Sequence, residues 1–129
     1  MHQHKNTKPY ILLVEDDVKL RNLIQTALLD ADFQVICATD GLEASTKLKN
    51  QKFSMVVTDL NIPKKDGIKL ANEIASSANI PVLLITGELE NFEIRLKALD
   101  GVMLLPKPFK VEIIPALVAK ILKTNTKAA

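Results

Sequence analysis

The sequence has only one cysteine and no long apolar run. Cys37 stands in the apolar stretch FQVICA and cannot form an internal disulfide, so we interpret it as a core residue in a reducing compartment. No apolar run approaches the roughly 20 residues that cross a bilayer. The opening stretch MHQHKNTKPY has no apolar core, so we expect no secretory signal there. These absences favour a cytoplasmic protein.

Internal repeats, low-complexity segments and linkers are also absent from the sequence. Its 129 residues correspond to one domain. A chain of this length buries roughly two-thirds of its unfolded surface, so it needs no disulfide or metal to fold. We expect the folded domain over residues 9–124, with a disordered arm or tag remnant at residues 1–8 and a flexible tail at residues 125–129.

Neither sign of charge dominates the sequence. Lysine and arginine number 17, and aspartate and glutamate number 15, for a formal net charge of +2. The basic residues are scattered among acids, whereas a nucleic-acid binder more often clusters them on one face. Direct nucleic-acid binding is therefore not expected.

The sequence does contain five short apolar runs. Most are continuously apolar rather than alternating, which is typical of strands covered on both faces of a parallel sheet. The runs are residues 10–15, 33–37, 53–59, 81–86 and 102–106.

Between these runs, apolar residues repeat with the period of a helix. In residues 20–31 they fall at i, i+3, i+4, i+7, i+8 and i+11, which forms one stripe on a helix. Similar stripes occur in residues 68–78, 89–99 and 114–121, and residues 40–51 are the least periodic. The order of strand and helix, repeated five times, predicts a doubly wound α/β fold with a five-stranded parallel sheet, right-handed crossovers and helices on both faces.

Polar side chains follow the predicted strands at the points where the chain leaves the sheet. In such folds the carboxyl ends of the strands share one edge, where ligands bind. Carboxylates gathered there repel one another and raise each other's pKa, and Mg²⁺, which binds oxygen ligands, would relieve this repulsion. A hydroxyl and an ammonium at the same edge could contact an added anion. The residues concerned are Glu15, Asp16, Asp17, Asp59, Thr86, Glu88 and Lys107.

Each of these side chains also has an ordinary structural interpretation. Asp17 is suited to cap the following helix. Asp59 alone is typical of a turn, Thr86 of a strand, and Lys107 of a solvated surface. Their occurrence at the same ends of different strands is what favours a site.

Four motifs, ILLVEDD, VVTDLNIPKKDG, PVLLITG and LLPKPF, occur in the order typical of the receiver domain of response regulators. The sequence resembles this CheY-like family from about Tyr10 to Leu122. The resemblance implies a flavodoxin-like (βα)5 fold with strand order 2-1-3-4-5. It also implies a signalling domain of a two-component pathway rather than a conventional enzyme.

The resemblance implies a phosphoryl-accepting metal site. Asp59 corresponds to the phosphoacceptor. Glu15 and Asp16 correspond to the acidic pair that binds Mg²⁺ or Mn²⁺, with Asp16 the more direct ligand. Asp59 and the backbone carbonyl of Asn61 would complete the protein ligands.

The resemblance also assigns the residues around the phosphoryl group. Thr86 and Lys107 correspond to the hydroxyl and the ammonium that contact it. The bond between Lys107 and Pro108 is commonly cis in this family, and a cis bond before proline would aim the lysine inward. Asn61 and Glu88 occupy positions that tune dephosphorylation in relatives.

One departure from the family concerns the switch. Relatives often have an aromatic residue three positions before the lysine, where this sequence has Leu104; Met103 is the alternative equivalent if the segment is one residue short. Another side chain, such as Phe92, would then carry the change to the surface formed by the fourth helix, the fifth strand and the fifth helix.

The resemblance implies specific partners. A histidine kinase or a histidine phosphotransfer protein would donate the phosphoryl group, and a downstream protein or an output domain would read the change. The sequence leaves open whether the chain forms a weak homodimer, and no membrane partner is expected.

Two other functions remain as alternatives. An aspartyl phosphatase would place a second Asp two residues after the nucleophile, where this chain has Asn61, and would need a cap domain for its substrate. A pseudo-receiver would bind partners without being phosphorylated, as the missing aromatic would allow.

Overall fold

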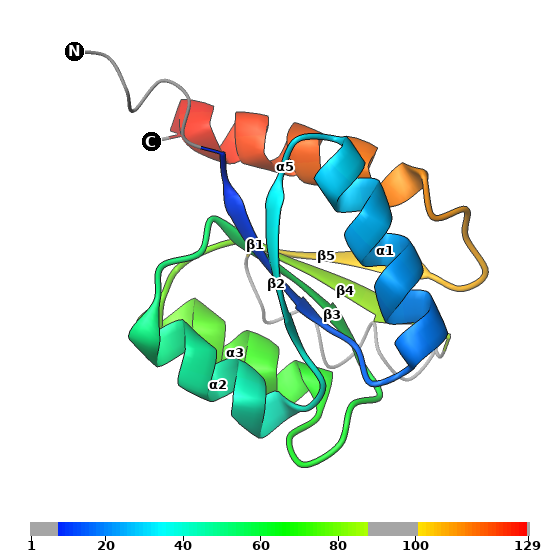
Figure 1. Cartoon of the computed structure of the whole chain (residues 1–129). Helices are drawn as coiled ribbons and strands as arrows, with labels where there is room; N and C mark the ends of the chain where they lie inside the picture. The colour runs from blue at the N-terminus through cyan, green and yellow to red at the C-terminus, as the bar shows by residue number, and fades with distance from the viewer. Residues whose placement is uncertain (1–7, 88–100, 129) are drawn as a thin grey trace.

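The computed structural model describes residues 8–87 and 101–128, with only the backbone described from residue 125 on. These residues form a parallel sheet flanked by helices (Figure 1). The strands are β1 (Tyr10–Val14), β2 (Gln34–Ala38), β3 (Met55–Asp59), β4 (Val82–Thr86) and β5 (Val102–Pro106). The described helices are α1 (Val18–Asp30), α2 (Gly41–Asn50), α3 (Gly67–Ser77) and α5 (Ile113–Ala128). The helix predicted over residues 89–99 lies outside the described residues.

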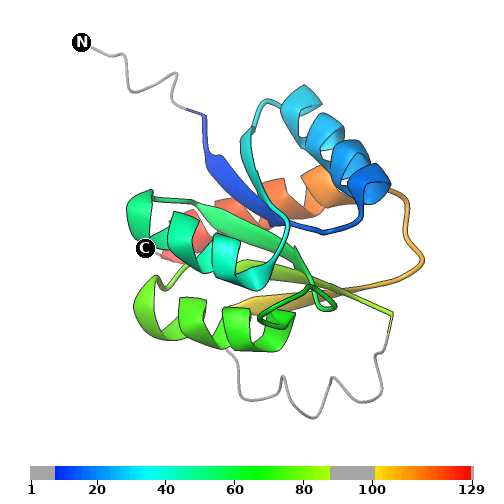
Figure 2. The same ribbon diagram turned by 60° about the horizontal axis from the view of Figure 1, so that its bottom comes forward.

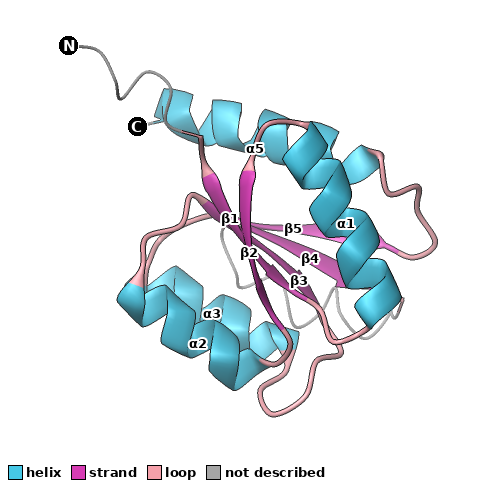
Figure 3. Cartoon of the chain, in the orientation of Figure 1, coloured by secondary structure: helices cyan, strands magenta, loops and turns pink. Residues whose placement is uncertain are grey.

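The sheet has five parallel strands in the order β2-β1-β3-β4-β5, which confirms the predicted fold class and strand order (Figure 3). β3 is therefore the central strand, and its neighbours are β1 and β4. Parallel strands end at a common edge, so the residues that follow β1, β3, β4 and β5 are brought together although they are distant in sequence.

Helices cover both faces of the sheet. α1 and α5 lie on one face, and α2 and α3 lie on the other (Figures 1 and 2). Ile11 and Leu13 of β1 pack with α1 and α5, whereas Leu12 and Val14 pack with α2 and α3. Successive side chains of a strand point to opposite faces. A strand buried on both faces is therefore apolar at most positions, which explains the apolar runs.

Aspartates begin three of the helices. Asp17 accepts hydrogen bonds from the backbone N–H groups of Lys19 and Leu20, as its capping interpretation predicts. Asp40 caps α2 and Asp66 caps α3 in the same way. The capped α2 confirms the least periodic of the predicted helices.

The element boundaries differ from the predicted ones by one or two residues, and more at the C-terminus. The second strand begins at Gln34 because the backbone N–H of Phe33 still donates to Leu28 at the end of α1. α5 extends to Ala128, into the predicted tail at residues 125–129. Neither glycine nor proline follows Pro115 in the sequence to stop that helix.

Within residues 8–87 and 101–128, none of the helices has the length and apolar composition needed to span a membrane.

Candidate functional site

Asp59 is the last residue of the central strand, and its carboxylate is almost fully buried, with 4% of the residue exposed. Its two oxygens have different partners. Oδ2 accepts a hydrogen bond from Nζ of Lys107 at 3.0 Å, and Oδ1 accepts one from the backbone N–H of Asn61 at 3.1 Å. The carboxylate is thus held in one orientation at the edge of the sheet, between a cation and a backbone dipole.

Glu15 follows β1, the strand beside β3, and is 2% exposed. Its Oε2 accepts a hydrogen bond from the backbone N–H of Asp17 at 3.1 Å. Its Oε1 is a buried oxygen without a hydrogen-bond partner in the described part of the chain. The neighbouring group is the Asp59 carboxyl, and two ionised carboxylates can only accept hydrogen bonds. A hydrogen bond between Glu15 and Asp59 can therefore form only when one of the two carboxyls is protonated.

The environment of Glu15 disfavours its charged form. Burial raises the pKa of its carboxyl first, and the hydrogen bond that the protonated form makes with Asp59 and the charge of Asp59 raise it further. The backbone N–H of Asp17 and the charge of Lys107 lower it only in part, so the pKa reaches about 8. A neutral Glu15 can donate to Asp59, and a cation placed between the two carboxyls would take the place of that proton.

The donor set fits a small divalent cation. Among the residues that the structure describes, no three His, Cys, Asp or Glu side chains converge into an acidic cage. Mg²⁺ needs no such cage, because it takes one or two carboxylates and keeps waters or phosphate oxygens on its other positions. Glu15 and Asp59 supply two facing carboxyls, and the exposed Asp16 follows Glu15 directly.

Lys107 directly follows β5, and a hydrogen bond to the end of β4 helps to position it. Its backbone N–H donates to the carbonyl of Thr86 at 2.7 Å, and its peptide bond with Pro108 is cis. Burial alone would lower the pKa of the Lys107 ammonium, but the hydrogen bond and charge of Asp59 and the charges of Glu15 and Asp17 outweigh it. The net effect raises the pKa. Lys107 is therefore a permanent cation beside Asp59.

Thr86 ends β4 and is fully buried. In the register of the sheet, Ile85 pairs with Asp59 and Thr86 pairs with Pro106. Thr86 thus lies one position beyond Asp59 on the adjacent strand, at the same edge as Lys107. Glu88, also predicted for this site, lies outside the described residues.

Comparison with known proteins places this arrangement in a family. Residues 11–119 match the response regulator receiver domain family. The chain belongs to this family. Receiver domains are signalling domains of two-component systems; they interact with histidine kinases and bind Mg²⁺ in their active site.

Individual relatives agree with this assignment. The chain is 37% identical over 119 residues to the transcriptional regulatory protein CpxR homolog of Haemophilus influenzae, covering 89% of this chain and 51% of that protein. The chain thus spans about half the length of this curated relative. Among solved structures, chemotaxis response regulator CheY4 of Vibrio cholerae superposes with a TM-score of 0.81 at 26% identity, covering 89% of this chain and 99% of that one.

A further neighbour shares the receiver fold. It is the receiver domain of sensor histidine kinase PA1611 from Pseudomonas aeruginosa PAO1, with a TM-score of 0.79 at 24% identity, covering 91% of this chain and 99% of that one. That structure has a magnesium ion coordinated in its active site cleft.

The sheet register of this receiver places Leu104 rather than Met103 on the face of Thr86. Leu104 pairs with Leu84, two residues before Thr86, so the two lie on the same side of the sheet. Leu104 packs against a small buried cluster that includes Leu84 and Leu60. Met103 is 39% exposed and belongs to the opposite face, beside α5. Of the two candidates for the switch position, Leu104 is therefore the one that shares a face with Thr86, and Phe92 lies outside the described residues.

The sequence interpretation missed a group of interacting polar residues. It connects the β3–α3 loop of this receiver, residues 60–66, to two helices. Lys65 donates to Ser45 on α2 and to Glu73 on α3. In the sequence Lys65 is one of two adjacent lysines in an ordinary turn. Nothing in the sequence distinguishes Lys65 from the exposed Lys64.

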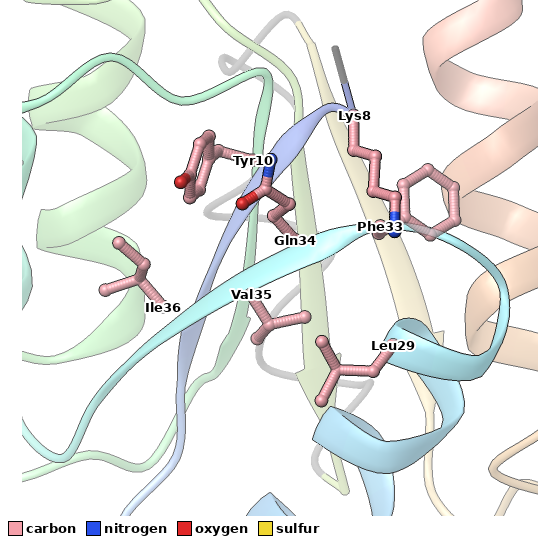
Figure 4. Close-up of a pocket in the computed structure, with 7 residues that line it drawn as sticks. All are labelled: Lys8, Tyr10, Leu29, Phe33, Gln34, Val35 and Ile36. Carbon is pink, nitrogen blue, oxygen red and sulfur yellow. The ribbon is translucent and has the colours of Figure 1, made fainter. Parts of the chain in front are cut away.

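The receiver also has a hollow of about 630 Å³ at the other end of the sheet (Figure 4). Tyr10 and Gln34, the first residues of β1 and β2, help to line it, together with Leu29 and Phe33. It lies at the amino ends of the strands, whereas Asp59 and Lys107 follow the carboxyl ends. It is therefore separate from the candidate site.

Proposed function

We propose that this receiver accepts a phosphoryl group on Asp59 from a histidine kinase or a histidine phosphotransfer protein. One observation carries the proposal. The Asp59 carboxylate ends the central strand between the ammonium of Lys107 and the buried carboxyl of Glu15. This arrangement combines a fixed nucleophile with a cation suited to a dianionic group and a carboxyl suited to a metal ion.

In the proposed reaction, a carboxylate oxygen of Asp59 attacks the phosphorus of a phosphohistidine. The bond from phosphorus to the imidazole nitrogen breaks, and the imidazole leaves with the electron pair. Lys107, already beside Oδ2, offsets negative charge on the transferring group, and such charge compensation supplies most of the catalysis in phosphoryl transfer. The hydroxyl of Thr86 would contact the bound phosphoryl group.

Glu15, Asp16, Asp59 and the backbone carbonyl of Asn61 would hold Mg²⁺ or Mn²⁺ in this proposal. The unpartnered Oε1 of Glu15 supports the assignment. When bound, the metal ion would offset charge on the transferring phosphoryl oxygens.

The product is a mixed anhydride, which hydrolyses and returns the carboxylate. Asn61 and Glu88 would tune that rate. The phosphoryl group adds roughly one and a half to two negative charges and strong acceptors. We infer that Thr86 moves towards them and that the surface of the fourth helix, β5 and α5 repacks.

A cytoplasmic setting and a protein readout complete the proposal. The free thiol of Cys37 is consistent with a reducing compartment. A downstream protein or an output domain would read the change. A weak homodimer formed through the repacked surface would be another way of transmitting it. The relative in Haemophilus influenzae is a transcriptional regulator, but DNA contact by the receiver itself is not part of the proposal.

Intact-mass spectrometry tests the phosphorylation. The protein is incubated with a small phosphodonor with and without Mg²⁺, beside the Asp59→Asn variant. We expect one added phosphoryl group in the wild type with Mg²⁺ and none in the other samples. No addition, together with no binding of beryllofluoride, would instead identify a pseudo-receiver.

A further inference from the structure

The β3–α3 loop is tied to the α2–α3 face by a cluster of three side chains: Ser45, Lys65 and Glu73. We propose that this cluster is a positioning device, which fixes the loop so that Asn61 and Asp59 keep the geometry of the metal and phosphoryl site. The inference rests on the proposed function above and deepens it. It makes α2 and α3 a second surface coupled to the site.

The cluster joins three separate elements. The ammonium of Lys65 donates to Oγ of Ser45 at 2.7 Å and to Oε1 of Glu73. The Ser45 hydroxyl lies 3.0 Å from Glu73 Oε1 and 3.1 Å from the carbonyl oxygen of Gly41. A hydroxyl has one proton, so it donates to one of these two acceptors at a time. One cation on the loop thus contacts both α2 and α3.

The loop and α2 are in close contact beside this cluster. The backbone N–H of Gly41 donates to the carbonyl of Pro63 at 3.1 Å, and Lys64 pairs with Asp40 at 3.5 Å. A Cβ at Gly41 would lie only 2.3 Å from the carbonyl oxygen of Lys65, so the two backbones touch. The tip of the loop is therefore held against the start of α2.

The same loop is rigidly linked to the phosphoacceptor. Asn61 donates its backbone N–H to Asp59, and the backbone N–H of Gly67 closes the base of the loop on Leu60 at 2.9 Å. The segment between them is held as well, because the backbone N–H of Ile62 donates to Leu60 at 3.2 Å and that of Lys65 donates to Pro63 at 2.8 Å. A displacement of Lys65 at the tip would therefore change the orientation of Asn61, whose carbonyl is the proposed metal ligand.

The Glu73 carboxyl of the cluster has a lowered pKa. Burial raises the pKa of Glu73, but hydrogen bonds from Lys65 and Ser45 outweigh burial. The charges of Lys65 and Lys49 act in the same direction, and the pKa is lowered. Glu73 is therefore ionised and remains paired.

A purely structural role is the alternative. The Lys65 and Glu73 side chains are 23% and 31% exposed, and ion pairs at this exposure contribute little to global stability. A positioning role is therefore tested by measuring hydrogen exchange in the loop and the affinity for Mg²⁺, and not by thermal unfolding alone.

The test compares Lys65→Met with Lys47→Met in the full chain. Lys47 forms an ion pair with Glu43 at 3.6 Å, and both residues lie on α2. Removing the Lys47 charge therefore deletes an ion pair of α2 that does not involve the loop. A third variant exchanges the charges, with Lys65→Glu and Glu73→Lys together, and Lys65→Glu alone is its reference.

Two readouts precede any phosphorylation. Hydrogen exchange of the Asn61 amide in metal-free protein reports the loop, and amide NMR shifts during a Mg²⁺ titration report metal affinity. We expect Lys65→Met to speed Asn61 exchange and to weaken Mg²⁺ binding, each by about tenfold. Lys47→Met should leave both unchanged, and the exchanged pair should recover most of what Lys65→Glu loses.

The outcomes separate this inference from the proposed function. If the wild type is phosphorylated and Lys65→Met matches it in exchange and in Mg²⁺ affinity, the positioning role is wrong and the phosphoacceptor role stands. Equal losses in Lys65→Met and Lys47→Met would also overturn it, because they would indicate a general effect on α2. If the wild type neither binds Mg²⁺ nor accepts a phosphoryl group, the proposed function fails and the inference fails with it.

Discussion

Nζ of Lys107 lies 3.0 Å from Oδ2 of Asp59, although 48 residues separate them in the sequence. The strand order produces this contact, because β3, β4 and β5 are neighbours and Lys107 donates its backbone N–H to Thr86 at the end of β4. The two side chains differ in exposure, 39% for Lys107 and 5% for Asp59. The carboxylate is thus enclosed while its counter-ion stays accessible to an incoming anion.

We predict that Lys107→Met slows phosphorylation of Asp59 by about 100-fold, the effect of removing one charge-stabilising donor from such a site. The initial rate of mass increase with a small phosphodonor measures it. Lys110→Met is the matched control, because Lys110 is an exposed lysine three residues along the chain. Equal rates for the two variants would remove Lys107 from the transfer step.

We predict that stability without divalent cations falls as pH rises from about 4.5 to about 8. The pKa of Glu15 is about 8 in the folded protein and 4.5 is its ordinary value. In this range the unfolded chain has lost a proton that the folded chain retains, so unfolding becomes easier by at most about 1.4 kcal/mol per pH unit. Below pH 4.5 both states are protonated and the effect is absent.

Urea unfolding at pH 5 and pH 8, in wild type and Glu15→Gln, measures this dependence. Glu15→Gln should lose less stability than wild type between the two values, because it carries no proton to release. Added Mg²⁺ should reduce the loss in wild type, since it favours the ionised carboxylate. Parallel pH profiles for the two proteins would show that Glu15 titrates normally.

The fold was predictable because burial on both faces leaves a direct record in the sequence. Each strand of the sheet overlaps one of the five predicted apolar runs, and α1 and α3 overlap predicted helical stripes. Strand limits were less predictable. Phe33 is apolar and buried, yet its backbone N–H closes the end of α1, so it falls outside β2.

The site was predictable only where its residues follow strands. Glu15, Asp59, Thr86 and Lys107 do so, and the parallel sheet brings their ends together. The cluster around Lys65 was not predictable, because it depends on how two helices and a loop approach one another. Such contacts between side chains have no fixed spacing in the sequence.

We predict that Leu104→Ala destabilises the protein by about 2 kcal/mol, whereas Met103→Ala costs less than about 1 kcal/mol. Leu104 packs against the buried Leu84 cluster, and Met103 is 39% exposed on the other face. Denaturant unfolding measures both. A larger loss for Met103→Ala would mean that the sheet register near Thr86 differs from the one described here.

The start of α3 is in close contact with the end of the strand that carries Asp59. A Cβ at Gly67 would lie 2.8 Å from both the carbonyl oxygen of Asp59 and Cα of Leu60, and these backbone atoms cannot move aside without moving Asp59. Gly67→Ala should therefore cost about 1–3 kcal/mol of stability and slow phosphorylation.

Gly87→Ala is the stability control, since a Cβ there meets no atom of the described residues within 4 Å. Unfolding of both variants in urea, followed by the initial phosphorylation rate of Gly67→Ala under folding conditions, separates the two effects. A Gly67→Ala protein as stable as Gly87→Ala would show that the chain after Asp59 has room to shift. The orientation of the carboxylate would then depend on its hydrogen bonds with Lys107 and Asn61 rather than on the contact with α3.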